Sequence, residues 1–197
     1  MHPITHEESP GSTRICFWGN KGMSRTSTPR VYLAGPDVFY PDVADRAAKL
    51  KDTCRHYGFE GVFPLDSGLQ LTTPIAREEN GYLIYEANCK LIRSCQAILA
   101  NVSPFRGPSL DAGTAFEIGY GRALGLDVVG YTSSLTLYKD RVTPDGLMIE
   151  DFGMIDNLMI HGSICGDIFK SPHEALDYLA ILFESGDPTP RLGTLKV

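Results

Sequence analysis

The stretch Asn101-Val-Ser-Pro-Phe-Arg-Gly-Pro-Ser-Leu-Asp111 leads directly into Ala112-Gly-Thr-Ala-Phe-Glu117-Ile-Gly-Tyr-Gly121. It follows a short apolar run at 97–100, crosses a segment rich in Pro and Gly, and enters a segment typical of a helix. Asp111 is a good helix N-cap, because its carboxylate can accept hydrogen bonds from the free N–H groups of the first turn. The stretch therefore predicts a strand, a loop and a helix, with acidic side chains just beyond the strand.

Two interpretations of these acidic side chains are open. Ligands of open α/β sheets bind at the carboxyl ends of the strands, where Asp111 and Glu117 are expected to lie. Gly113 and Gly121 stand four positions from Glu117 and have no side chains, which would leave room beside its carboxylate. The alternative is that Asp111 only caps the helix and that Glu117 is a solvated helix residue. The stretch alone favours neither.

Outward from this stretch, strand patterns alternate with helix patterns. Apolar runs predict strands at 30–35, 61–64, 97–100 and 126–131, and a last one within 163–169. Helical spacing of apolar residues predicts helices at 42–57, 77–94, 111–125 and 173–184. Residues 65–76 and 132–156 are expected to be irregular, and 157–160 to form a strand or a loop entering one. This alternation predicts an α/β fold, a flavodoxin-like three-layer sandwich with a five-stranded parallel sheet.

The predicted helix at 77–94 carries a polar residue within its apolar stripe. The stripe includes Ile84, Leu91 and Ile92, and Asn88 falls inside it. An amide on a buried face costs about 1–3 kcal/mol if it makes no hydrogen bond. Asn88 is therefore either a hydrogen-bonded residue of the core or its rim, or an amide at the rim of a pocket that faces a ligand.

Length and composition indicate one globular domain. The 197 residues predict a disordered extension at 1–29, a domain at 30–184 and a tail at 185–197. A net charge of -6 argues against a nucleic-acid partner. No apolar run reaches the roughly 20 residues that a membrane-spanning helix needs, so no membrane partner is expected. No secretory signal pattern is present and the five cysteines are scattered, which favours a cytoplasmic protein with reduced thiols.

The familiar motifs of cofactor and metal chemistry are missing from the sequence. It has no GxGxxG fingerprint after a strand, no Walker A sequence, no HExxH and no GxSxG, and its five histidines are dispersed. We therefore expect neither a cofactor nor a metal. Carboxylate and amide chemistry remains, and it suits cleavage at an acetal-like carbon through an oxocarbenium-like transition state.

Five segments, in order, carry a resemblance to a known family. They are Tyr32-Leu-Ala-Gly-Pro36 with Phe39, Ile84-Tyr-Glu-Ala-Asn88, Asn101-Val-Ser-Pro-Phe-Arg-Gly-Pro108, Asp111-Ala-Gly-Thr-Ala-Phe-Glu-Ile-Gly119 and Asn157-Leu-Met159. With these segments the chain resembles the nucleoside 2-deoxyribosyltransferases over about residues 30–184. The block from Asp111 to Glu117 is the most specific part.

The resemblance implies catalytic roles for three residues. Glu117 would be the nucleophile that attacks C1′ and carries the 2-deoxyribosyl group. Tyr32 would hold the Glu117 carboxylate in line through its hydroxyl. Asp111 would bind the sugar hydroxyls or the edge of the base.

It also implies substrate-binding roles. Asn88 would contact the base or assist its protonation, and Gly35 and Phe39 would line the base pocket. Asn157 and Met159 would reach the 5′-hydroxyl end of the substrate in the neighbouring subunit's site. The expected partners are therefore a 2′-deoxynucleoside, a free nucleobase and further copies of the chain, as a homo-oligomer built from dimers.

The implied function is transfer of a 2-deoxyribosyl group between purine or pyrimidine bases through a covalent glutamyl intermediate, in nucleoside salvage. One alternative is a hydrolase on the same fold, cleaving 2′-deoxynucleosides or their 5′-monophosphates, with Arg106, Ser103 and Ser109 as candidate phosphate donors. Another is a nucleoside-binding module without chemistry. The range of bases, the subunit number beyond a dimer unit and the role of the C-terminal tail stay open at this stage.

Overall fold

The computed structural model of the chain describes residues 27–68 and 77–185. The extension predicted at 1–29 and the tail predicted at 185–197 fall almost wholly outside the described residues, as does most of the loop predicted at 65–76. In the described part of the chain no helix is long and apolar enough to cross a membrane.

The centre of the fold is a parallel sheet of five strands, as the sequence predicts. The strand order is β2-β1-β3-β4-β5, the flavodoxin-like order. Ala100 of β3 lies opposite Ala34 of β1 and Gly130 of β4, so β3 is the central strand. The strands are β1 (Arg30–Ala34), β2 (Glu60–Val62), β3 (Ala97–Asn101), β4 (Asp127–Tyr131) and β5 (Ile168–Phe169).

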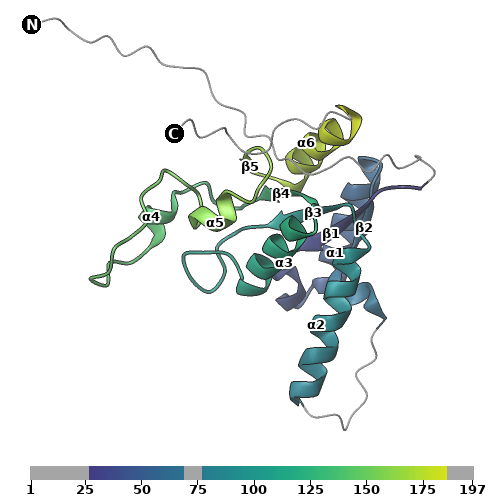
Figure 1. The fold of residues 1–197 in the computed structure, drawn as a ribbon, viewed down its shortest axis with the longest axis horizontal. Coiled ribbons are helices and arrows are strands. Elements are labelled where there is room, and N and C mark those ends of the chain that lie inside the picture. The colour runs from purple at the N-terminus through teal and green to yellow at the C-terminus, as the bar shows by residue number, and fades with distance from the viewer. Residues whose placement is uncertain (1–26, 69–76, 186–197) are drawn as a thin grey trace, which may run out of the picture.

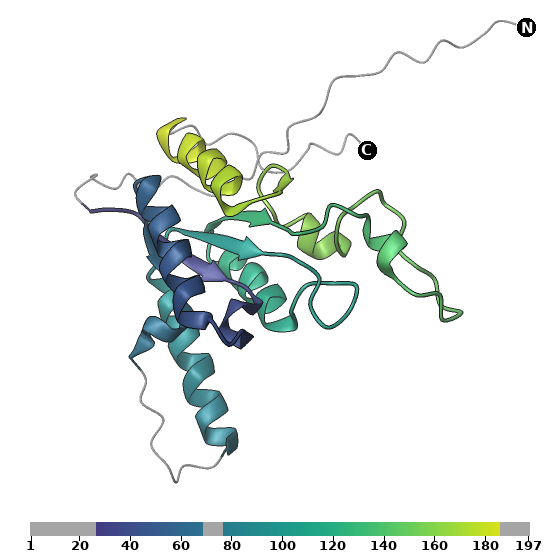
Figure 2. The same ribbon diagram turned by 180° about the vertical axis from the view of Figure 1, so that it is seen from behind.

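Helices cover both faces of the sheet and complete a three-layer sandwich (Figures 1 and 2). α1 (Val43–His56) and α6 (Pro172–Ser185) pack on one face, and α2 (Arg77–Arg93) and α3 (Ala112–Ala123) on the other. Two short helices, α4 (Tyr138–Arg141) and α5 (Leu158–His161), belong to an arm beyond β4 that projects from the sheet (Figure 1). Two 3₁₀ turns complete the described elements, η1 (Pro36–Phe39) and η2 (Pro64–Ser67).

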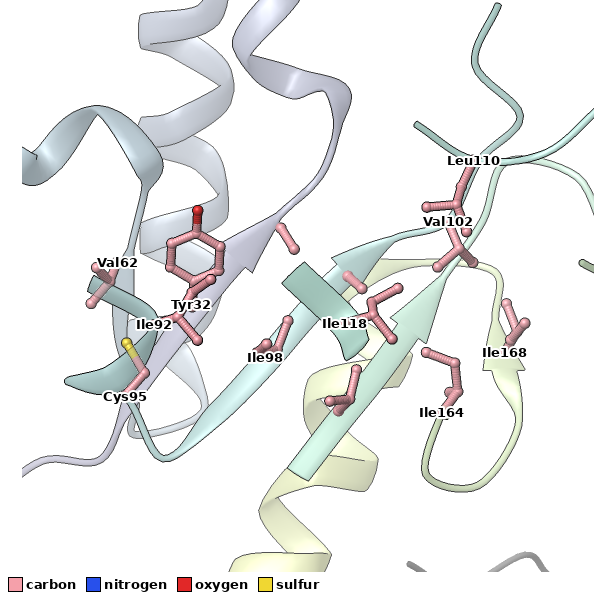
Figure 3. Packing of buried hydrophobic residues seen from close by; sticks show 13 residues of the cluster. Tyr32, Val62, Ile92, Cys95, Ile98, Val102, Leu110, Ile118, Ile164 and Ile168 are labelled. Carbon is pink, nitrogen blue, oxygen red and sulfur yellow. The ribbon is translucent and has the colours of Figure 1, made fainter. Parts of the chain in front are cut away.

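The apolar core is split by the sheet into two clusters. Ala97 and Leu99 of β3 face the cluster under α1 and α6, while Ile98 and Ala100 face the cluster under α2 and α3. Figure 3 shows the second cluster, which Tyr32 joins from β1. A central strand that is buried on both faces must be apolar along its whole length, which explains why 97–100 contains no polar residue.

Two local predictions are wrong. Residues 157–160 do not form a strand, because Asn157 caps the short helix α5: its Oδ1 accepts from the N–H of Met159 at 3.0 Å. Ile84 of the predicted apolar stripe is 43% exposed, whereas Cys89 and Ile92 are buried. The first half of α2 extends beyond the sheet (Figure 1), so it has little to pack against there.

The central strand gives a direct test of this core. Leu99 is 1% exposed, so Leu99→Ala should lower the free energy of unfolding by about 2–5 kcal/mol through lost burial and a residual cavity. The matched control is Leu147→Ala at a side chain that is 76% exposed, which should change it by less than about 0.5 kcal/mol. Urea denaturation measures both, and equal effects of the two substitutions would contradict the assigned core.

Candidate active site

A tyrosine and a glutamate from opposite parts of the chain meet at the centre of the site. The hydroxyl of Tyr32, on β1, donates a hydrogen bond to Oε1 of Glu117, on α3, over 2.6 Å. The Tyr32 side chain is fully buried. Its hydroxyl oxygen points away from the neighbouring apolar side chains of the cluster (Figure 3). The bond therefore fixes the Glu117 carboxylate against the edge of the core.

Burial controls the ionisation of this pair. Loss of hydration raises the pKa of Glu117 to about 7, and the negative charge of Asp111 adds to the rise, while the Tyr32 hydrogen bond opposes it. Burial, together with the Glu117 charge, raises the pKa of Tyr32 above its ordinary value, so the phenol stays a proton donor. Glu117 is thus a partly buried carboxyl group that ionises near neutral pH, and the interpretation as a solvated helix residue is wrong.

Asp111 caps α3 as the sequence predicts. Its Oδ2 accepts from the backbone N–H of Thr114 at 3.1 Å and from the Thr114 hydroxyl at 3.4 Å. These bonds hold the Asp111 carboxylate at the helix N-terminus, where the free N–H groups stabilise negative charge.

The two glycines near Glu117 differ in their surroundings, and at Gly121 the expectation of room for a ligand is wrong. A Cβ on Gly113 would lie 2.9 Å from Oδ2 of Asp111, so the glycine lets the cap carboxylate approach the helix. A Cβ on Gly121 would lie 2.3 Å from Cδ1 of Ile98, so that glycine lets α3 approach β3. This approach brings Glu117 within reach of Tyr32.

The loops that follow β1 and β3 meet at the carboxyl ends of these neighbouring strands. Phe39 of η1 stacks on Phe105 of the β3–α3 loop, with ring centroids 5.4 Å apart. The guanidinium of Arg106, a residue with positive φ of 55°, lies 4.8 Å from the Phe105 ring centroid. Phe39 is 54% exposed, so the stack lies at the surface. Sequence reasoning assigned Phe39 to a pocket but missed Phe105, for which the only signal was its place after β3.

The remaining predicted residues lie on α2 and at the start of α5. Asn88 is partly buried on α2, one turn after Tyr85, whose ring lies 5.8 Å from that of Phe116 on α3. The amide of Asn157 donates to Oε1 of Glu150 at 2.8 Å, and Met159 is 72% exposed. None of the hydrogen bonds in the described residues joins Asn88 or Asn157 to Glu117.

A buried carboxylate that sequence reasoning missed ties the site to the arm. Asp156 is 1% exposed and accepts from the N–H of Leu110 at 3.2 Å and the N–H of Asn157 at 2.8 Å. It also accepts from the Ser109 hydroxyl and pairs with Arg141. Asp156 thereby fixes the segment before Asp111 to the segment that begins α5.

The chemistry available here is that of carboxylates and a phenol. Across residues 27–68 and 77–185, no three His, Cys, Asp or Glu side chains are grouped so as to hold a metal ion. A carboxylate with a pKa near 7, aligned by a phenol, can act as a nucleophile or as a proton carrier in this pH range. The fold and this pair together define an α/β site whose available chemistry is that of a carboxyl group and a phenol.

Comparison with known proteins identifies the family. Residues 31–159 match the nucleoside 2-deoxyribosyltransferase family, and the chain belongs to that family. An uncharacterized protein of Schizosaccharomyces pombe is 31% identical over 164 residues, which cover 69% of this chain and 77% of that protein.

Solved structures agree in fold. The 2-deoxyribosyltransferase of Leishmania mexicana is 30% identical, with a TM-score of 0.66 over 78% of this chain and 97% of its own. A 2-deoxyribosyltransferase of Bacillus psychrosaccharolyticus is 20% identical, with a TM-score of 0.53 over 76% of this chain and 91% of its own. The latter likeness is evidence of the fold alone.

The raised pKa of Glu117 makes stability depend on pH in a defined direction. Its pKa rises from 4.5 to about 7 on folding, so the folded state binds the proton more tightly and ionisation opposes folding. The wild type should lose about 2–3 kcal/mol of stability as pH rises from 4.5 through 7. Glu117→Gln, which cannot ionise, should escape this loss, so it should exceed the wild type in stability at pH 8 and match it near pH 4.5.

Urea denaturation of both proteins from pH 4.5 to 8 measures this difference. Glu184→Gln, at an exposed position on α6, is the control and should not change the pH dependence. A stability gap between Glu117→Gln and the wild type that stays constant over this range would contradict the raised pKa.

Proposed function

We propose that the protein transfers the 2-deoxyribosyl group of a 2′-deoxynucleoside from one nucleobase to another. The observation that carries the proposal is the hydrogen bond between Tyr32 and a Glu117 whose pKa lies near 7. Membership of the nucleoside 2-deoxyribosyltransferase family supports the same reaction, as does the likeness to the Leishmania mexicana 2-deoxyribosyltransferase.

Glu117 acts as the nucleophile in this proposal. Its ionised carboxylate attacks C1′ while the C1′–N bond breaks, and the base leaves with the electrons of that bond. An oxocarbenium-like charge develops at C1′, and the missing 2′-hydroxyl eases its formation. The product is a glycosyl ester on Glu117, which a nitrogen of the second base then displaces. The Tyr32 hydroxyl aligns the carboxylate throughout.

The polar groups around Glu117 have separate tasks. The departing base carries negative charge unless it is protonated or hydrogen-bonded, and Asn88 supplies a polar group for this purpose. Asp111, held by the Thr114 N–H, accepts from the sugar hydroxyls or the edge of the base. Gly35 and Phe39 line the base pocket. No metal or cofactor takes part in these steps.

A complete site in this proposal requires a second copy of the chain. Asn157 and Met159 of one subunit contact the 5′-hydroxyl end of the substrate in the other. Two observations support this arrangement. Met159 is 72% exposed, and the Asn157 amide is bonded to Glu150 of its own arm, with no hydrogen bond to its own Glu117. The arm that carries them projects from the sheet (Figure 2).

The hydrolase alternative for 5′-monophosphates is not favoured. It relies on Ser103, Ser109 and Arg106 as phosphate donors. The hydroxyl of Ser103 donates to Oδ1 of Asn101 at 2.7 Å, and that of Ser109 donates to Asp156. Arg106 lies against the aromatic rings of Phe39 and Phe105. Two of the three groups are thus committed within the protein, and the Asp156 carboxylate that accepts from Ser109 would repel a phosphate there.

A two-base assay tests the proposed reaction. The protein is incubated with deoxyadenosine plus cytosine, and separately with deoxyadenosine plus hypoxanthine, and the products are separated by chromatography. We expect a new deoxynucleoside in at least one tube, and the responding tube gives the base class. Glu117→Ala should lower the rate by at least about a thousandfold, because no nucleophile remains.

Other outcomes of the same assay contradict the proposal in distinct ways. Free adenine without a new deoxynucleoside would make the protein a hydrolase. When dAMP replaces deoxyadenosine in further tubes, faster turnover of dAMP would reverse the choice of a free 5′-hydroxyl. Intact deoxyadenosine in both tubes, with binding retained by Glu117→Ala, would indicate a binding module.

Subunit complementation tests the shared site. Glu117→Ala and Met159→Ala are each expected to be nearly inactive as separate proteins. A mixture that has exchanged subunits should recover part of the wild-type rate, because one site of each mixed dimer carries both native residues. No recovery after exchange, as verified by native mass spectrometry, would place Met159 in the site of its own chain.

A further inference from the structure

A hydrogen bond between two side chains joins the carboxyl ends of β1 and β3. Asn101 is the last residue of β3, and its Nδ2 donates to Oδ2 of Asp37 at 2.9 Å. Asp37 belongs to η1, directly after β1, and is 5% exposed. β1 and β3 are neighbours in the sheet, at the point where the strand order reverses. The bond therefore spans the crevice in which flavodoxin-like folds bind their ligands.

Neighbouring groups fix the direction of this bond. The N–H of Ser103 at 3.2 Å and its hydroxyl at 2.7 Å both donate to Oδ1 of Asn101. Because Oδ1 faces these donors, Nδ2 must face Asp37. The other oxygen of Asp37 accepts from Arg46 of α1 at 3.2 Å. Every polar atom of both side chains thus has a partner, which makes the pair a rigid unit.

The same two loops meet a second time at the surface. Phe39 lies two residues after Asp37, and Phe105 lies four residues after Asn101, and their rings stack. Gly35 lies between the strand end and Asp37. A Cβ there would be 2.8 Å from Cβ of Asn101 and 3.0 Å from Oδ2 of Asp37. A larger residue at position 35 would therefore push Asn101 and Asp37 apart, so their hydrogen bond requires glycine there.

We infer that Asp37 and Asn101 form a positioning pair for the base pocket. By holding the loop after β1 against the loop after β3, the pair sets the positions of Gly35, Phe39 and Phe105, and thereby the width of the space that receives the base. This inference rests on the proposed function for the identity of the ligand. Phe105 becomes, with Phe39, an aromatic wall for a planar base. Neither Asp37 nor Asn101 contacts the reacting atoms.

A purely structural pair would behave differently from a positioning pair. If the bond only stabilised the fold, its loss would lower stability, but the molecules that remained folded would bind the base as before. If the bond sets the pocket, its loss raises KM for the base, while Glu117, which is held by Tyr32 and not by this pair, keeps its rate once the base is bound. The split between KM and kcat therefore separates the two cases.

A charge-swap experiment makes this test. Asn101→Asp places two carboxylates where a donor and an acceptor meet. In the double variant Asp37→Asn with Asn101→Asp, the new amide can donate to the new carboxylate, whose other oxygen still accepts from Ser103. Asn101→Ala removes the donor without adding charge. It replaces Asn101→Asp in the test if charge repulsion prevents that variant from folding. The matched control is Asp42→Asn, which removes the exposed carboxylate bound to Nε of Arg46 at 2.9 Å.

The measured quantities are KM and kcat for the base accepted in the two-base assay, and the Kd of free adenine by calorimetry. We expect Asn101→Asp and Asn101→Ala to raise KM and Kd by about tenfold or more, with kcat changed by less than about threefold. The double variant should return KM and Kd to within about threefold of the wild type, and Asp42→Asn should leave them unchanged.

Unchanged KM and Kd in both single variants would overturn the inference, and so would a double variant no better than Asn101→Asp. A wild type that forms no new deoxynucleoside would contradict the proposed function instead. In that case the Kd of adenine still decides whether the pair positions a base.

Discussion

The hydrogen bond between Tyr32 and Glu117 is the interaction on which the site depends, and several features of the fold serve to make it possible. Its two residues are 85 positions apart, so it forms only when β1 lies beside β3 and α3 packs closely on the sheet. Gly121 permits that packing, and Asp111 fixes where α3 begins. Burial then changes the ionisation of this carboxyl group, because it raises the pKa of Glu117 to about 7.

Around this bond, two buried carboxylates connect loops to one another by accepting hydrogen bonds from them. Asp37 connects the loop after β1 to Asn101 and α1, and Asp156 connects the segment before α3 to the arm that carries Asn157. Each of the two carboxylates is nearly inaccessible to solvent and accepts several hydrogen bonds, which offsets its desolvation. The irregular segments near Glu117 are thus held in place by specific long-range bonds.

The sequence was sufficient for the alternation of strands and helices, for the cap at Asp111 and for most helix positions, because each follows from local periodicity or a local hydrogen bond. The strand order followed only from the order typical of such an alternation. The sequence failed for residues 157–160, where a four-residue helix leaves no periodic pattern to detect. It also misjudged Gly121, since a missing side chain can mean either empty space or close packing. The bond between Asp37 and Asn101 joins residues 64 positions apart, and that between Asp156 and Leu110 joins residues 46 apart, and no local pattern encodes such pairs.

Trapping the covalent intermediate is the most direct test of Glu117 as the nucleophile. The protein is mixed with deoxyadenosine without an acceptor base, quenched in acid, digested and examined by mass spectrometry, with Glu117→Gln in parallel. We predict one deoxyribosyl group on the peptide that contains Glu117, formed in a burst with free adenine and absent from Glu117→Gln. A burst of adenine with an unmodified Glu117 peptide, or a deoxyribosyl group on another residue, would contradict the nucleophile role of Glu117.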